Sequence, residues 1–246
     1  MSSSRVCLAT LALVGVCMSA SADSTVVDFE DGMTHGWEGP QGFGGISFID
    51  PSNGVGGSAG YRTQFSDFGI VFANSTNPAF VGNFAQYQQV TFSVDVKVDQ
   101  IGTFLPVPRP FMLELRDFDT AQGGYPWSSV FFLFDWISQD THGDYTTFSV
   151  TIDDPSSVDL PAGWGGYGDY DPVTFETRLP PGVTFADILA GVDEIAYSTY
   201  LPDFFFTDEF FDVTLDNITV TTVVPAPGAA GALTLSLLAG VRRRRR

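Results

Sequence analysis

Two short stretches of the sequence place aromatic rings beside glycines. GGYPW contains Tyr125 and Trp127, and GWGGYGDY contains Trp164, Tyr167 and Tyr170. Exposed rings supply flat apolar area at low entropic cost, and glycines let the backbone approach a ligand closely. Such faces beside hydrogen-bonding groups suit sugar rings, so these five residues are candidate ligand-binding residues. For Trp164, the alternative is that its ring closes the end of the core.

Carboxylates near both ends of the expected domain form a candidate cation site. Asp28, Glu30 and Asp31 lie near its start and Asp216 lies near its end. Calcium takes about six to eight oxygen ligands, which carboxylates and loop carbonyls supply. We therefore expect a structural Ca2+ site at these four residues, the alternative being ordinary acids at strand ends and turns. A second acidic loop, with Asp169 and Asp171, is a lesser candidate.

Residues typical of catalytic sites are sparse. His35 and His142 are the two histidines, whereas a zinc site needs about three or four N or S ligands. With 29 acids, some pair always has the spacing that glycoside hydrolysis requires, so no particular pair can be singled out. We assign no catalytic residue and expect a non-catalytic protein. A polysaccharide-acting hydrolase is the least favoured alternative.

The first 22 residues have the pattern of a secretory signal peptide. Arg5 supplies the positive charge, residues 6–17 the apolar run, and residues 20–22 (ASA) the cleavage site. Both cysteines, Cys7 and Cys17, lie in this segment. The exported chain is therefore expected to have no disulfide and no thiolate metal site.

The expected domain, residues 23–223, is strongly acidic. It has five basic residues against 29 acids, a net charge of −24. Because binding to phosphates depends on Lys and Arg replacing counterions, nucleic acid is excluded as a partner. Self-repulsion of this size favours a saline habitat or bound cations.

The last segment, residues 224–246, combines a turn, an apolar run and a cationic end. Pro225 and Pro227 precede an uncharged run over 228–241, and five arginines, beginning with Arg242 and Arg243, follow it. As a helix the run would rise roughly 21 Å, short of the ~30 Å hydrocarbon core. The arginines should stay on the cytoplasmic side, which places the upstream chain outside.

This tail resembles the PEP-CTERM sorting signals of bacterial envelope proteins, with Ala226 at the position of their glutamate. The resemblance implies that an exosortase-type membrane transpeptidase recognises the tail transiently and removes it. It also implies delivery to the cell envelope or extracellular matrix of a bacterium, with the membrane contacted only through this segment.

Alternation of apolar and polar residues predicts an all-β domain. Residues 89–99 alternate strictly, which is the period-two pattern of a half-buried antiparallel strand. Further strands are expected at 61–73, 111–118, 130–137, 147–153, 195–200 and 213–223. The continuously apolar 130–137 should be covered on both faces. Only 184–190 has a helical pattern, with Thr184 as N-cap and Gly191 as stop. We expect a two-sheet antiparallel β-sandwich, a jelly roll, with one short helix.

Several segments, taken in order, resemble secreted bacterial proteins with a laminin-B-like domain, which are related to the galactose-binding jelly rolls. They are VVDFEDGMTHGWEG, the turn at Phe80, Gly82 and Asn83, LPAGWGGYG, FADILAGVDEIAYSTY and LDNITV. The resemblance implies a jelly roll with a structural calcium between the first and last strands. It implies no catalytic residue.

These observations predict a secreted or surface-displayed module that binds or organises extracellular polysaccharide. A structural or adhesive matrix protein with no specific small ligand is the alternative. The phenylalanines at 204–206, 210 and 211 are expected either to close the core or to form an exposed patch for self-association.

Overall fold

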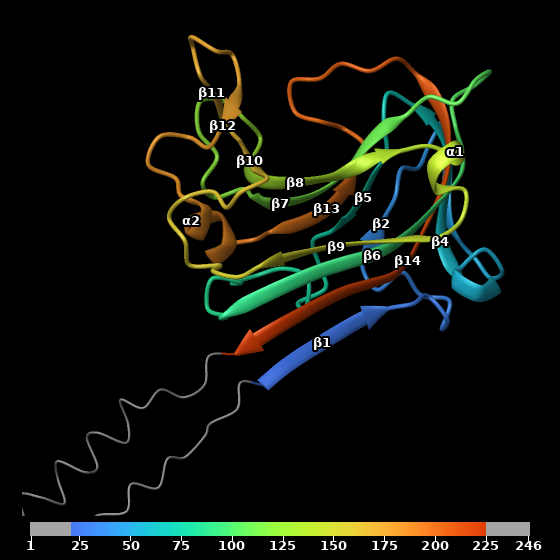
Figure 1. Cartoon of the computed structure of the whole chain (residues 1–246), viewed down its shortest axis with the longest axis horizontal. Helices are drawn as coiled ribbons and strands as arrows, with labels where there is room; N and C mark the ends of the chain where they lie inside the picture. The colour runs from blue at the N-terminus through green and yellow to red at the C-terminus, as the bar shows by residue number, and fades with distance from the viewer. Residues whose placement is uncertain (1–20, 225–246) are drawn as a thin grey trace, which may run out of the picture. The chain divides into compact units, whose positions relative to one another are not determined.

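Two antiparallel sheets face each other across the core in the computed structural model, which describes residues 21–224 (Figure 1). Residues Ala22–Val224 form one compact unit. Sheet A contains, in spatial order, β3 (Gly45–Asp50), β4 (Gly60–Asp67), β14 (Glu209–Val224), β6 (Gln89–Ile101) and β9 (Thr146–Ile152), with β1 (Ser21–Val27) also paired to β14. Sheet B contains β10 (Trp164–Tyr167), β8 (Ser128–Ile137), β7 (Arg109–Asp117), β13 (Glu194–Ser198), β5 (Val71–Asn74) and β2 (Trp37–Glu38). A small ribbon of β11 (Asp169–Tyr170) and β12 (Thr177–Arg178) forms a third sheet.

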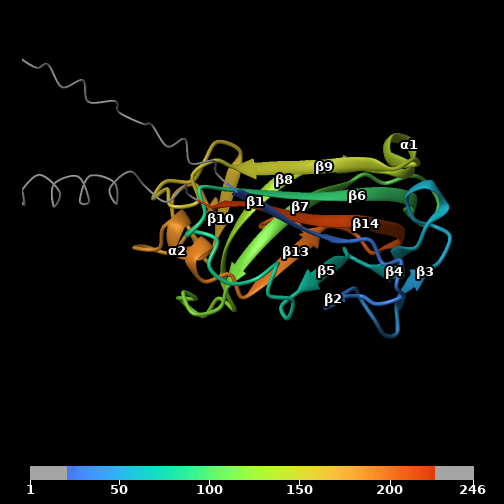
Figure 2. The same cartoon turned by 90° about the horizontal axis from the view of Figure 1, so that it is seen from below.

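The strand order is that of a jelly roll. Sheet A carries β4-β14-β6-β9 and sheet B carries β5-β13-β7-β8, so the chain passes repeatedly from one sheet to the other. The pairings within these two sets are antiparallel. The expected two-sheet antiparallel β-sandwich is confirmed. Its first and last strands, β1 and β14, run side by side (Figures 1 and 2).

The sequence periodicity translates directly into burial in β6. Alternate residues of this strand, from Val90 to Val98, are fully buried, and the residues between them are half-buried. β8 differs from its prediction, because neither of its faces is buried along its whole length. Its residues 131–134 are half-buried and Trp136 is 41% exposed. β8 is therefore buried at residues 128–130 and at Ile137, and is partly covered or exposed between them.

Residues 61–73, predicted as one strand, form two strands in different sheets. β4 ends at Asp67 in sheet A, and β5 begins at Val71 in sheet B. Gly69 lies at the crossing, where a Cβ would be 3.0 Å from Oγ1 of Thr199. Both strands turn apolar residues toward the same core. The hydrophobic pattern therefore continues across residues 68–70, and the sequence does not show that the chain changes sheets there.

The predicted helix is confirmed as α2 (Phe185–Ala190). Thr184 is its N-cap and forms a capping box with Asp187, and Gly191 is its C-cap. A second helix, α1 (Gln139–His142), was not expected, because a single turn is too short to show helical periodicity. α1 and α2 lie at opposite ends of the sandwich (Figure 2). A 3-10 turn, η1 (Val55–Gly57), precedes β4.

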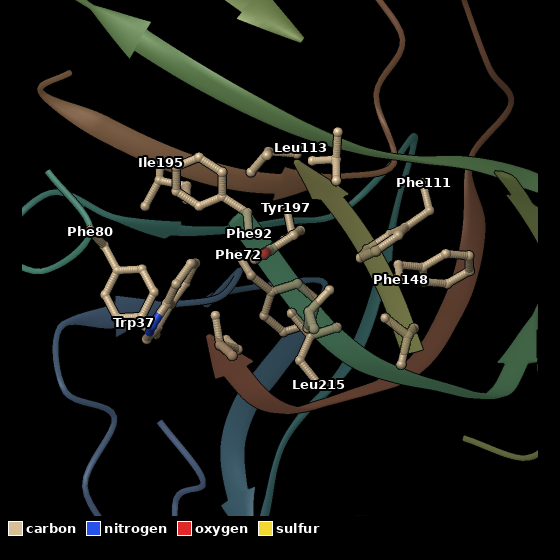
Figure 3. Close-up of a cluster of buried hydrophobic side chains, with 14 of the residues drawn as sticks. Trp37, Phe72, Phe80, Phe92, Phe111, Leu113, Phe148, Ile195, Tyr197 and Leu215 are labelled. Atoms are coloured by element: carbon tan, nitrogen blue, oxygen red, sulfur yellow. The ribbon is translucent and has the colours of Figure 1, made fainter. Parts of the chain in front are cut away.

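The core between the sheets contains a connected group of aromatic rings (Figure 3). Tyr197 lies at its centre, stacked on Phe111 with centroids 5.8 Å apart and on Trp37 with centroids 5.7 Å apart. Its hydroxyl donates to the Ser93 carbonyl oxygen at 3.3 Å. Burial strongly raises the pKa of Tyr197, so this hydroxyl stays protonated.

The expected signal segment and sorting tail lie outside the described residues, except at their inner ends. Ser21 and Ala22 begin β1, and Val224 ends β14. Between residues 21 and 224, no helix is long and apolar enough to span a bilayer.

Candidate functional site

Three of the five predicted ligand-binding aromatics come together on the open face of sheet B. Tyr125 and Trp127 lie on the connection from β7 to β8, and Tyr167 lies on β10. The ring of Tyr167 is 5.3 Å from that of Tyr125 and 6.1 Å from that of Trp127, measured between centroids. Two glycine-containing stretches that are separate in the sequence thus contribute to one aromatic cluster.

These rings border a hollow of about 570 Å³, which we call the sheet-B hollow. Its lining residues are Val71, Met112, Glu114, Arg116, Tyr125, Trp127, Tyr167, Tyr200, Leu201, Pro202 and Asp203. Strand alternation explains its floor. Leu113 and Leu115 of β7 are fully buried in the core. Met112, Glu114 and Arg116, which alternate with them, therefore turn to the opposite face and line the hollow.

Glu114 organises the floor of the hollow through both carboxylate oxygens. Its Oε1 accepts from Ser129 Oγ at 2.6 Å and from Trp127 Nε1 at 3.0 Å. Its Oε2 accepts from Nε and Nη2 of Arg116, at 2.8 and 2.6 Å. Glu114 is only 4% exposed, and this set of four donors compensates for its buried charge.

Two carboxylates bond to Arg116, and an aromatic ring packs against its guanidinium. Its Nη1 donates to Oε1 of Glu194 at 2.6 Å, and its Cζ lies 4.3 Å from the ring centroid of Trp127. Burial opposes the charge, but Glu114 and Glu194 outweigh it and raise the pKa of Arg116. Arg116 therefore remains a cation stacked on an aromatic face.

The tyrosines of the hollow keep their hydroxyl protons. Burial raises the pKa of Tyr167, with Tyr125 and Glu114 adding to the effect. Burial and the charges of Asp169 and Asp203 raise the pKa of Tyr125. Each phenol can therefore donate one hydrogen bond and accept others.

Two segments rise beside the hollow. Figure 1 shows the β11–β12 ribbon and the 199–208 connection standing on the side of sheet B that faces away from sheet A. Arg178 ties the ribbon together by pairing with Asp169 at 2.8 Å and with Asp171 at 3.2 Å. The acids of the second predicted acidic loop thus have an arginine partner.

The other two predicted ligand-binding residues lie elsewhere. Trp164 is 8% exposed and packs against Phe132 and Phe185, with centroids 5.6 and 5.4 Å away, so its ring closes the core. Tyr170 is 48% exposed on the ribbon, where it stacks on Phe175.

The glycines of GWGGYG have a packing role that the sequence did not reveal. Gly165 is paired with Phe131 across β10 and β8, and the Phe131 ring occupies the place that a Cβ of Gly165 would take. A Cβ on Gly166 would lie 2.7 Å from the Leu179 backbone nitrogen. These glycines admit neighbouring protein atoms, whereas we had expected them to admit a ligand.

Sequence reasoning missed the polar floor and one wall of the hollow. Glu114 and Arg116 occur in one predicted strand, Tyr200 ends another, and Glu194, the partner of Arg116, immediately precedes that second strand. The available signal was in β7 itself, where Glu114 and Arg116 of FMLELR insert two charges of opposite sign into an apolar strand. Two charged residues at i and i+2 share one face of a strand.

The structure brings two of the four predicted calcium ligands to the same segment. Glu30 Oε1 accepts from the Ala59 N–H at 2.9 Å, and Asp216 Oδ2 accepts from the Val55 N–H at 2.8 Å. Burial raises the pKa of Asp216. Asp28 instead accepts from the Glu30 N–H. Asp31 accepts from the N–H of Met33 and lies 3.0 Å from His35 Nε2.

Within the described range, no three His, Cys, Asp or Glu side chains gather as a metal site. The calcium site therefore stays a prediction. It would have to be completed by backbone carbonyls of the 54–59 segment.

Some phenylalanines of the 204–211 region close the core, as one expectation had it, and others are exposed, as the alternative had it. Phe211 is fully buried in the core, and Phe206 is 8% exposed beneath Arg109, whose Cζ is 5.0 Å from its ring centroid. Phe204 and Phe205 are 57% and 87% exposed. Arg109 Nη2 donates to the Thr207 carbonyl oxygen at 2.9 Å, which fixes the 199–208 connection to β7.

No family model matches the sequence, and no curated protein matches it. Solved structures resemble it only loosely. A family 30 carbohydrate-binding module has a TM-score of 0.41 and 12% identity, over 77% of this chain and 83% of that one. The CBM22-1–GH10 modules of Clostridium thermocellum xylanase 10B, complexed with xylohexaose, have a TM-score of 0.45 and 14% identity, over 80% of this chain and 28% of that one.

An exo-beta-agarase gives a TM-score of 0.46 and 15% identity, over 82% of this chain and 25% of that one. The chain therefore spans only about a quarter of the xylanase and agarase chains that it matches. At these scores the comparisons assign no family and no ligand, so the function has to be argued from the hollow itself.

Proposed function

We propose that this protein is a non-catalytic module that binds an extracellular polysaccharide in the sheet-B hollow. The observation that carries the proposal is the convergence of Tyr125, Trp127 and Tyr167 over a polar floor. Apolar ring faces beside fixed hydrogen-bonding groups match a sugar ring, which has apolar C–H faces and a hydroxylated edge.

Preorganisation supports binding at this place. Trp127 is held through its indole N–H by Glu114 and through its ring face by Arg116. A ring whose orientation is already fixed loses little conformational entropy when a ligand stacks on it. The protonated phenols of Tyr125 and Tyr167 add donors that sugar hydroxyls can use.

The bonding of the floor favours binding over hydrolysis. Glycoside hydrolysis needs one carboxylic acid that gives a proton to the leaving group and a second carboxylate across the scissile bond. Both oxygens of Glu114 already accept hydrogen bonds from Trp127, Ser129 and Arg116. Oε1 of Glu194 accepts from Arg116. These carboxylates are therefore engaged as acceptors within the protein.

A glycan array probed with the full chain tests the proposal. We expect reproducible binding to at least one polysaccharide class, and we expect Trp127→Ala to weaken it by at least about tenfold. Silence across the array would favour the alternative, a matrix protein with no specific ligand. Release of reducing sugar by purified protein would overturn the non-catalytic assignment.

We further propose, from the terminal segments alone, that the chain is exported and sorted by an exosortase-type transpeptidase. The support is the signal-like start and the Pro225–Pro227, apolar, Arg242–Arg246 order of the tail. Replacing the five arginines by serines should leave export intact and prevent processing of the tail. Mass spectrometry of the envelope-associated protein would distinguish cleaved from uncleaved chains.

A further inference from the structure

We infer that the sheet-B hollow selects uncharged sugars over acidic ones and that Glu194 is the residue that sets this selectivity. The inference rests on the proposed function and deepens it. It follows from the placement of the one cation in the hollow and of the carboxylates around it.

Among the described residues that line the hollow, Arg116 is the only Lys or Arg. In an acid-binding site, such an arginine would offer its planar fork to the ligand carboxylate. Here Nε and Nη2 are already bonded to Glu114, and Nη1 is bonded to Glu194. Each hydrogen-bonding nitrogen of the guanidinium therefore has a carboxylate partner from the protein.

The contact between Arg116 and Glu194 is fixed by the sheet. The two residues are direct cross-strand partners in the antiparallel pairing of β7 with β13. Their side chains are 11% and 20% exposed, so the pair is largely shielded from water. A ligand anion would therefore have to compete with Glu194 for Arg116.

The local charge opposes acidic ligands further. Glu114 and the exposed Asp203 line the hollow, and Glu194 is bonded to Arg116 behind that lining, so three negative charges surround the single positive charge of Arg116. A uronate carboxylate or a sulfate ester would meet this excess with no free cation, and juxtaposed like charges are strongly unfavourable. Sugar hydroxyls, by contrast, can donate to carboxylate oxygens.

Glu194 is a better candidate for setting this selectivity than Glu114. Glu114 also holds Trp127 and Ser129, so replacing it would disturb the aromatic cluster. The side chain of Glu194 bonds to Arg116 and to no other described side chain. Glu194→Gln keeps the shape and an acceptor for Nη1 while removing one negative charge.

The test is binding of the full chain to matched pairs of soluble polysaccharides. Hydroxyethyl and carboxymethyl derivatives of one β-glucan, one xylan and one galactan preparation serve as probes. Affinity electrophoresis in about 0.5 M NaCl shortens the screening length to a few ångströms, which suppresses repulsion by the acidic surface as a whole. Asp159→Asn is the matched control, because it removes one exposed acid that neither lines the hollow nor bonds to Arg116.

We expect the wild-type chain to prefer an uncharged derivative by about tenfold or more, and Glu194→Gln to narrow that preference about fivefold. Asp159→Asn should leave it unchanged, and circular dichroism should show both variants folded. Equal binding of both derivatives by the wild type would overturn the inference and leave the proposed function standing. An unchanged preference in Glu194→Gln would remove Glu194 as its cause. Binding to no derivative would refute the proposed function itself.

Discussion

The guanidinium of Arg116 lies over the ring of Trp127, with its Cζ 4.3 Å from the ring centroid. The same Trp127 donates its indole N–H to Glu114, which is the carboxylate that holds Arg116. The three side chains thus form a closed set in which each one fixes the other two. The orientation of the aromatic surface offered to a ligand is consequently held by residues of the sheet beneath it.

Trp127→Ala should weaken binding of an uncharged polysaccharide by at least about tenfold, since aromatic residues at the centre of a binding site commonly contribute 2 kcal/mol or more. Trp164→Phe is the control, because Trp164 packs in the core. It should lower the melting temperature with little effect on affinity. Isothermal titration and a thermal melt of both variants separate these effects, and equal affinity losses would contradict the assignment of the site.

Arg116→Met should destabilise the fold, because it leaves Glu114 buried without its counterion. Losing one partner of a buried ion pair costs about 3–5 kcal/mol, and a domain of this size melts about 2–4 °C lower for each kcal/mol. A drop of about 10 °C is therefore expected. Adding Glu114→Gln to this variant should recover part of the drop.

Arg178→Met is the matched control for this experiment. Arg178 also pairs with two acids, but its side chain is 44% exposed on the β11–β12 ribbon. Exposed ion pairs contribute about 0–1 kcal/mol to stability. The melting temperature of Arg178→Met should therefore differ from that of the wild type by no more than a few degrees. Similar losses in both variants would show that burial of the Arg116 network has no special effect.

Asp117 should give a pH-dependent difference in stability. It is 3% exposed and accepts from the N–H groups of Asp119 and Thr120, at the start of the connection that carries Trp127. Burial raises the pKa of Asp117 above its ordinary value of 3.8. Any stability gained from this shift is present at low pH and is lost as the pH rises through the folded-state pKa.

Asp117→Asn keeps an acceptor for both N–H groups and removes the buried charge. Its melting temperature relative to wild type should therefore be more favourable at pH 7 than at pH 4. Differential scanning calorimetry across this range measures the difference. A difference in melting temperature between Asp117→Asn and the wild type that does not change with pH would contradict the raised pKa of Asp117.

Calcium should stabilise the domain more than ionic strength alone. Glu30 and Asp216 both contact the 54–59 segment, and a ligand present at a hundredfold excess over its Kd adds about 2.7 kcal/mol. We expect millimolar calcium to raise the melting temperature by several degrees over EDTA. The increase should vanish in Asp216→Asn and persist in Asp31→Asn. Equal melting in calcium and in sodium chloride of matched ionic strength would refute the site.

The sequence alone determined the fold class and most strands, because local alternation reports which face of a strand is buried. β6, β9 and α2 follow directly from their residue patterns. The same patterns misjudged residues 61–73 and the burial of β8. Alternation shows that a face is apolar, but it does not show in which sheet the strand lies or whether anything covers that face.

The site needed the tertiary structure. The sequence marked aromatic residues by their glycine neighbours, but only strand pairing placed Tyr125, Trp127 and Tyr167 together and put Trp164 in the core. Glu194 became relevant only because the register of β13 sets it opposite Arg116. Composition and periodicity are local properties of the chain, whereas a binding site depends on distances between residues far apart in sequence, which the packing of two sheets decides.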